Sequence, residues 1–257
     1  TCHVGMDSGT GHAAAGASRS EGDRHVARVA CQSCHIPTYG KGIGTEVARD
    51  FRVKHDGTDA ETCSAQNPCP GHPESIMMTN LIPDYKFWNR TSDSALLGDD
   101  ASLTFDYVRG TYPTSRPNGD VNDGKLYPFK YKTAIQPKTL TDNRLISLDT
   151  FEYLKGTGNA SLSVEKGLVN MGYPADTPWE WVTGDTFQLI NHGVTPATGV
   201  APCTQCHGSM NTNLNLAADS MLDKLGYKLK GPASQICTQC HREKTPRTQE
   251  AMHNHLN

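Results

Sequence analysis

The 257-residue sequence has few hydrophobic residues and no long hydrophobic run. Hydrophobic side chains make up 36% of it, below the roughly 45–50% typical of globular domains, a benchmark that also counts glycine. No stretch approaches the ~20 apolar residues that cross a bilayer. No signal peptide is recognisable, so we expect a mature or truncated chain. A net charge of −3 gives no basic surface for nucleic acid or anionic membranes.

Disorder does not follow from this composition, because charge is nearly balanced and the chain contains 3 Trp, 9 Tyr and 6 Phe. Something other than side chains is therefore expected to fill part of the core. The 9 Cys and 11 His indicate what that is.

Three C-x-x-C-H pentads lie at residues 31–35, 203–207 and 237–241. Chance at this composition would give roughly 0.01 of them. The spacing is typical of c-type haem attachment, because two thiols reach the vinyl groups on one porphyrin edge while the adjacent His binds the iron. A zinc ribbon does not need a His after each cysteine pair, and a thioredoxin-like motif would occur once.

Thr1-Cys2-His3 is interpreted as the end of a fourth pentad whose first Cys lies upstream of residue 1; a coincidental Cys-His pair is the alternative. We therefore expect four haems c and a polypeptide longer than the numbered chain. The predicted haem-attaching cysteines are Cys2, Cys31, Cys34, Cys203, Cys206, Cys237 and Cys240, and the predicted proximal iron ligands are His3, His35, His207 and His241.

The seven remaining histidines are enough to give every iron a second axial imidazole. Bis-His iron is six-coordinate, so such haems pass electrons and do not bind substrate. His25 lies six residues before Cys31, His12 lies nine after His3, and His192 lies eleven before Cys203. These three are predicted distal ligands.

The other four histidines are ambiguous. His253 and His255 would be ~200° apart on a helix, so one haem takes only one of them. We assign His255 and leave the choice open. His55 and His72 are flanked by turn residues, where a solvated loop histidine is an equal alternative.

Cys63 and Cys69 form a C-x5-C without a following His. A small disulfide loop is the preferred interpretation, and a haem attached across this spacing is the alternative. A disulfide suits the oxidising compartment in which haem c is assembled.

Residues 73–191 contain neither His nor Cys but most of the aromatic residues. We predict an N-terminal haem pair (1–60), a haem-free aromatic-rich lobe with one disulfide (61–200) and a C-terminal haem pair (201–257). The expected fold is a multihaem cytochrome of mostly short helices and irregular loops wrapped around haems, with little sheet. Helices are predicted near 161–171, 216–229 and 246–256.

The sequence resembles the octahaem cytochrome c family named for tetrathionate reductase. The matching residues are T-C-H at 1–3, His12, His25, V-A-C-Q-S-C-H-I-P at 29–37, I-P-D-Y-K-F-W-N at 82–89, Y-P-F-K at 127–130, Q-P at 136–137 and I-N-H at 190–192 before C-T-Q-C-H at 203–207. The resemblance covers most of this chain but only the C-terminal part of that family. It implies axial roles for His25 and His192. The family's catalytic haem, with its Lys ligand, has no counterpart here.

We therefore predict an electron carrier rather than an enzyme, periplasmic or extracellular, with redox cytochromes or reductases as partners. Self-association is expected, including an extracellular filament in which an axial His is shared between subunits. The alternative is a reductase of small nitrogen or sulfur oxyanions that uses one open-coordinate haem.

Overall fold

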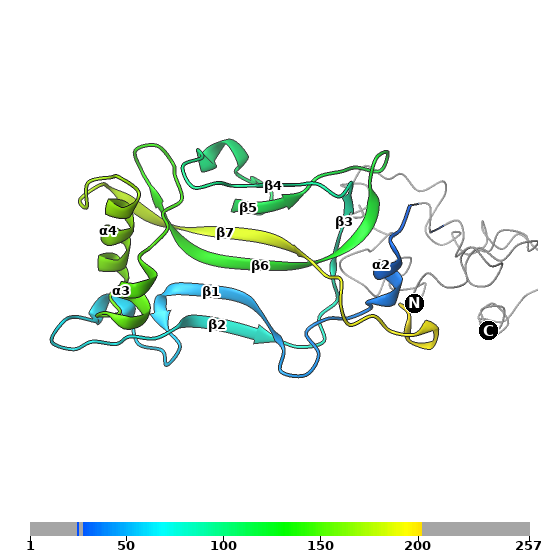
Figure 1. Cartoon of the computed structure of the whole chain (residues 1–257), viewed down its shortest axis with the longest axis horizontal. Helices are drawn as coiled ribbons and strands as arrows, with labels where there is room; N and C mark the ends of the chain where they lie inside the picture. The colour runs from blue at the N-terminus through cyan, green and yellow to red at the C-terminus, as the bar shows by residue number, and fades with distance from the viewer. Residues whose placement is uncertain (1–24, 26–27, 202–257) are drawn as a thin grey trace, which may run out of the picture.

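The computed structural model describes His25 and residues 28–201. Seven strands form one mixed sheet in the order β2-β1-β6-β7-β5-β4, and β3 pairs with β6 beside this path (Figure 1). The strands are β1 (Thr45–Lys54), β2 (Pro73–Met78), β3 (Asp84–Trp88), β4 (Ser92–Ser94), β5 (Tyr112–Pro117), β6 (Lys125–Thr139) and β7 (Trp179–Leu189).

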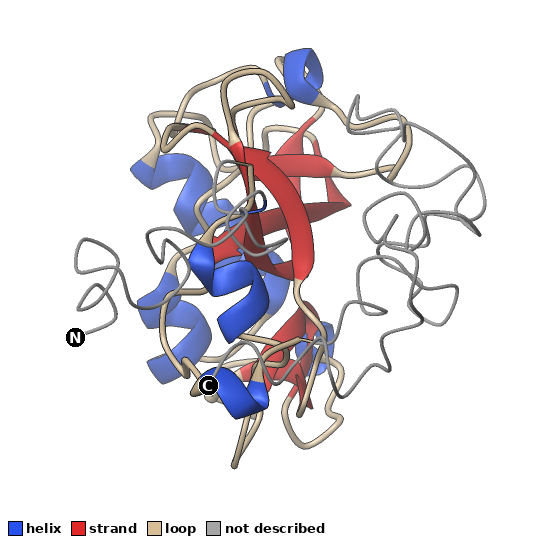
Figure 2. Cartoon of the chain, turned by 90° about the vertical axis from the view of Figure 1, so that its right-hand side faces the viewer, coloured by secondary structure: helices blue, strands red, loops and turns tan. Residues whose placement is uncertain are grey.

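The helices lie at the two ends of this elongated sheet (Figure 1). They are α2 (Cys31–His35) at one end and α3 (Thr150–Lys155) and α4 (Ala160–Asn170) at the other. Three single-turn 3-10 helices complete the described part: η1 (Ala60–Thr62), η2 (Ala101–Thr104) and η3 (Ala197–Gly199). Seen end-on, the strands form a twisted sheet (Figure 2). No helix among the described residues is long and apolar enough to span a membrane.

The prediction of mostly short helices with little sheet is wrong, because the described chain is built on this seven-stranded sheet. The reason lies in residues 73–191, which contain neither Cys nor His. This segment has no haem ligands of its own and must bury its aromatic and β-branched side chains against each other, which pleated strands do well. The helix predicted over 161–171 is present as α4. Those predicted over 216–229 and 246–256 lie outside the described residues.

The centre of the sheet is the long antiparallel pair β6–β7, in register from Phe129 opposite Leu189 to Thr139 opposite Trp179. Strand β1 runs parallel to β6, and β5 runs parallel to β7. The sheet therefore spans the distance between α2 and the α3–α4 pair, and it carries a separate hydrophobic cluster near each end.

At the α3–α4 end, the buried cluster contains Tyr153, Val164 and Leu168, with Trp179 and Trp181 packed against it. At the α2 end, Tyr127, Phe129 and Phe187 are buried, and Ala30, directly before α2, packs on them. The aromatic residues of the lobe thus form a core of their own and also support the helix that carries the first complete pentad.

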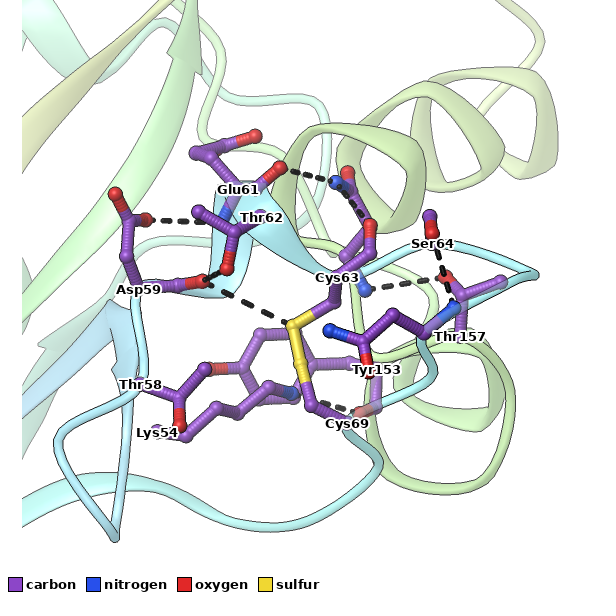
Figure 3. Close-up of a disulfide and its surroundings, with 12 residues drawn as sticks. Lys54, Thr58, Asp59, Glu61, Thr62, Cys63, Ser64, Cys69, Tyr153 and Thr157 are labelled. Atoms are coloured by element: carbon purple, nitrogen blue, oxygen red, sulfur yellow. Dashed lines mark hydrogen bonds between the residues drawn. A yellow bond between two sulfur atoms is a disulfide. The ribbon is translucent and has the colours of Figure 1, made fainter.

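A disulfide joins Cys63 and Cys69, whose Cα atoms are 5.5 Å apart (Figure 3). The loop it closes is tied to the α3–α4 region, because the Cys69 N–H donates to the Thr157 carbonyl at 2.8 Å. The Asn159 side chain also donates to the Cys63 carbonyl at 3.0 Å. The disulfide is therefore part of the α3–α4 end of the molecule.

Candidate functional site

The first complete C-x-x-C-H pentad forms helix α2. Residues three and four positions apart share one face of a helix, so Cys31, Cys34 and His35 lie on one side of α2. Cys31 is exposed, Cys34 is half-buried, and the two are not joined by a disulfide. Ser33 faces the protein and is only 1% exposed.

Ser33 fastens the buried face of α2 to the sheet. Its hydroxyl donates to the Leu126 carbonyl on β6 at 2.7 Å, and the Tyr85 hydroxyl on β3 donates to the Ser33 carbonyl at 3.3 Å. Just before the helix, the Ala30 N–H donates to the same Leu126 carbonyl at 2.9 Å. These bonds fix α2 on a rigid strand pair and leave the thiol side turned away from it.

His35 is held by a loop that follows β7. Its Nδ1 lies 2.9 Å from the Thr195 carbonyl oxygen, while the Thr195 N–H donates to the His35 carbonyl at 2.8 Å. A carbonyl only accepts, so Nδ1 carries the hydrogen and the lone pair of the neutral ring lies on Nε2. Nε2 is thereby prepared as the nitrogen that binds a metal, as in metal-ligating histidines whose other nitrogen donates to a carbonyl.

The same loop also contacts Cys34, the second cysteine of the pentad. The Ala201 N–H donates to the Cys34 carbonyl at 2.8 Å, so both ends of the segment 195–201 are bonded to α2. His192 lies three residues before Thr195 and is exposed. On the other side of α2, the His25 carbonyl accepts from the N–H groups of Arg28 and Val29, and its side chain is also exposed.

Behind α2, strand β3 alternates between two environments. Tyr85 is directed toward the helix, and its neighbours Asp84 and Lys86 interact with Arg109 and Arg116. Burial raises the pKa of Asp84, although the three nearby cations oppose it. Burial also lowers the pKa of Lys86, against the attraction of Asp84. Strand β3 thus carries a desolvated acid, Asp84, and a desolvated base, Lys86, on either side of Tyr85 in sequence. The Tyr85 hydroxyl bonds α2.

Of the predicted site residues, Cys31, Cys34 and His35 are brought together, and the segment containing His192 packs against them. His55 and His72 lie apart from this site, because Lys54, which precedes His55, bonds to Tyr153 of α3 at the opposite end of the sheet. The remaining predicted ligands lie outside the described residues: Cys2, His3, His12, Cys203, Cys206, His207, Cys237, Cys240, His241, His253 and His255.

Sequence reasoning missed Ser33 and Thr195, which position the motif. Ser33 occupies a variable place in the pentad, and Thr195, which contacts His35 through its backbone and its hydroxyl, lies 160 residues away. Neither residue belongs to a sequence pattern that would indicate its role. The donor set itself fits haem c: two cysteines without a disulfide between them and an imidazole with its tautomer fixed, on one side of a short helix.

Comparison with known proteins agrees with this chemistry. The sequence model of the family described as "Cytochrome c bacterial" matches residues 73–210, more than half of the chain. The chain therefore belongs to the bacterial cytochrome c family. It is thus a c-type cytochrome, a class that binds haem covalently and uses it to transfer electrons.

Among solved structures, the octaheme cytochrome c from Shewanella oneidensis has a similar fold, with a TM-score of 0.63 and 24% identity. The match covers 90% of this chain and 54% of that chain, so this chain spans about half of the octaheme protein's length. No curated protein matches this sequence. The resemblance to multihaem c-type cytochromes is thus confirmed.

Proposed function

We propose that the chain conducts electrons through four covalently bound haems c, most with two axial histidines. The observation that carries this proposal is the geometry of α2, where the His35 Nδ1 is bonded to the Thr195 carbonyl and both cysteines lie on the same helix side as His35. Haem c supplies a one-electron Fe(III)/Fe(II) couple when bound. The residues of this chain hold it in place and set the basicity of its proximal ligand.

The contact between α2 and segment 195–201 supports a chain of closely spaced haems. Ala201 is bonded to the Cys34 carbonyl, and Cys203 opens the second complete pentad two residues later. Two residues span at most about 7 Å. We therefore place the haems attached at residues 31–35 and 203–207 as direct neighbours.

For the second axial positions we retain His12, His25, His192 and His255. The exposure of the His25 and His192 side chains supports this assignment, since an imidazole that must reach iron cannot be packed into the protein core. We also propose a periplasmic or extracellular location. The Cys63–Cys69 disulfide supports it, because disulfides persist in oxidising compartments.

Self-association, including a filament with an axial His shared between subunits, is part of the proposal. The loop region between β4 and β5 supports it by exposing five large hydrophobic side chains that are each at least 67% accessible: Leu96, Leu97, Leu103, Tyr107 and Val108. Exposed apolar groups at this density are typical of interaction surfaces. Electron microscopy of the holoprotein tests the filament, and monodisperse small particles at all concentrations would count against it.

Electron paramagnetic resonance of the oxidised holoprotein tests the electron-carrier function. We expect only low-spin Fe(III) signals and no change in the Soret band on adding nitrite, hydroxylamine or tetrathionate. A high-spin signal together with a ligand-induced Soret shift would instead favour the reductase of small nitrogen or sulfur oxyanions.

A further inference from the structure

His55 and His72 form a backbone-bonded pair at the end of the β1–β2 ladder. The His55 N–H donates to the His72 carbonyl at 3.0 Å, one residue beyond the Lys54–Pro73 pair at which the ladder ends. His55 begins the turn that follows β1, which is closed by the Gly57 N–H donating to the Lys54 carbonyl at 2.9 Å. The backbone bond thus brings the two histidines together at this turn, and both line the same surface hollow.

Both imidazoles are available at the surface. Lys54 and Pro73, which end the ladder, are buried, whereas both histidines are exposed. They line one surface hollow together with Glu46, Arg49, Pro73, Ser75 and Met77. In the part of the chain that the structure describes, neither ring takes part in a hydrogen bond or ion pair.

We propose that His55 and His72 together bind one divalent transition-metal ion of the Zn²⁺ or Cu²⁺ class, separate from the haems. Neutral imidazole is a preferred ligand of these ions. The carboxylate of Asp56, which interacts electrostatically with His55, adds negative potential beside the site.

The two imidazoles are the protein ligands, and water fills the other coordination positions. Glu46 lines the same hollow, but its carboxylate is already bonded to Arg49, Lys132 and Ser75. No group of three or more His, Cys, Asp and Glu side chains within the described ranges is arranged to hold a metal. The ion therefore keeps exchangeable positions that open into the hollow.

The test is calorimetric titration of chelator-treated holoprotein with Zn²⁺. We expect H55A and H72A each to weaken one binding event by at least about tenfold, and the double variant to lose one equivalent of Zn²⁺. The control is M77L, which alters a residue of the same hollow that supplies no imidazole, and it should bind Zn²⁺ as the unmodified protein does.

Two results would overturn the proposal. One is a double variant with the same Zn²⁺ stoichiometry and affinity as the unmodified protein. The other is loss of a low-spin haem signal in H55A or H72A, because that histidine would then be an iron ligand rather than half of a surface site. An unchanged haem spectrum with loss of one equivalent of Zn²⁺ supports it.

Discussion

The His35 Nδ1 atom lies 2.9 Å from the carbonyl oxygen of Thr195, a residue 160 positions later in the chain. The bond joins helix α2 to the loop that follows β7 and precedes the pentad at residues 203–207. Thr195 returns a second bond, since its N–H donates to the His35 carbonyl. The orientation and basicity of the proximal imidazole therefore depend on the backbone of a remote loop.

Replacing Thr195 by proline removes the N–H that holds this loop on α2. A weakened Nδ1–H···O bond lowers the basicity of the His35 ring, so we expect one haem potential to rise and one set of low-spin g values to change. Potentiometry and electron paramagnetic resonance measure this. T195S keeps both backbone groups and the hydroxyl that donates to the His35 and Gly199 carbonyls, so it should resemble the unmodified protein. Identical spectra and potentials for T195P and T195S would contradict the assignment.

Gly158 is predicted to be sensitive because it lies directly against the disulfide loop. It has φ +82°, and a Cβ there would lie 2.2 Å from the Cys69 carbonyl oxygen. Gly57 has φ +86° with open space around it. We expect G57A to lower the free energy of unfolding by about 1–2 kcal/mol from the left-handed backbone alone. G158A should cost ~1–3 kcal/mol more, because the added methyl overlaps backbone atoms.

Denaturant unfolding of the two glycine variants measures this difference. They share the backbone strain, so the additional loss in G158A isolates the contact with the disulfide loop. Equal decreases in the free energy of unfolding for the two variants would show that the disulfide loop is not in close contact with Gly158.

Glu152 on α3 should make stability depend on pH. Hydrogen bonds from Lys166 and Thr157 lower the pKa of Glu152 to about 2, from an ordinary value of about 4.3. Because the folded-state pKa is depressed, the stabilisation is fully present above pH ~4.3 and is lost as the pH falls toward 2. E152Q should therefore be less stable at pH 7 by about 1.5–3 kcal/mol.

The difference in the free energy of unfolding between E152Q and the unmodified protein should decrease steadily as the pH falls from about 4.3 toward 2. Denaturant unfolding at each pH measures this difference. The matched control is E165Q, at an exposed position on the neighbouring helix α4, and it should show little change. A gap for E152Q that stays constant with pH would mean that its charge is not the source of the stabilisation.

The pentads, the small disulfide loop and the helix near 161–171 could be predicted because each depends on local spacing. The seven-stranded sheet could not be predicted in this way. Four consecutive residues of β6, from Leu126 to Phe129, are buried, so the strand lacks an alternating pattern. It also contains Pro128 and Pro137, which normally argue against a central strand.

Proline has no backbone N–H to donate, but its carbonyl can still accept a hydrogen bond, and both prolines of β6 do so. Pro128 accepts from the Ile190 N–H and Pro137 from the Ile146 N–H. The support of His35 by Thr195 was equally hidden, since backbone atoms of a distant loop provide it. The sequence motif therefore indicated Cys31, Cys34 and His35 as candidates, but it gave no sign of Ser33 and Thr195, which hold them in position.

Peptide-level mass spectrometry of the holoprotein, matured with haem c, tests the central claim most directly. We expect the peptide containing residues 31–35 to carry the mass of one haem, and the C31S/C34S double variant to lose one haem from its intact mass. A peptide recovered with unmodified thiols at Cys31 and Cys34, or an intact mass unchanged in haem content by the double substitution, would contradict it.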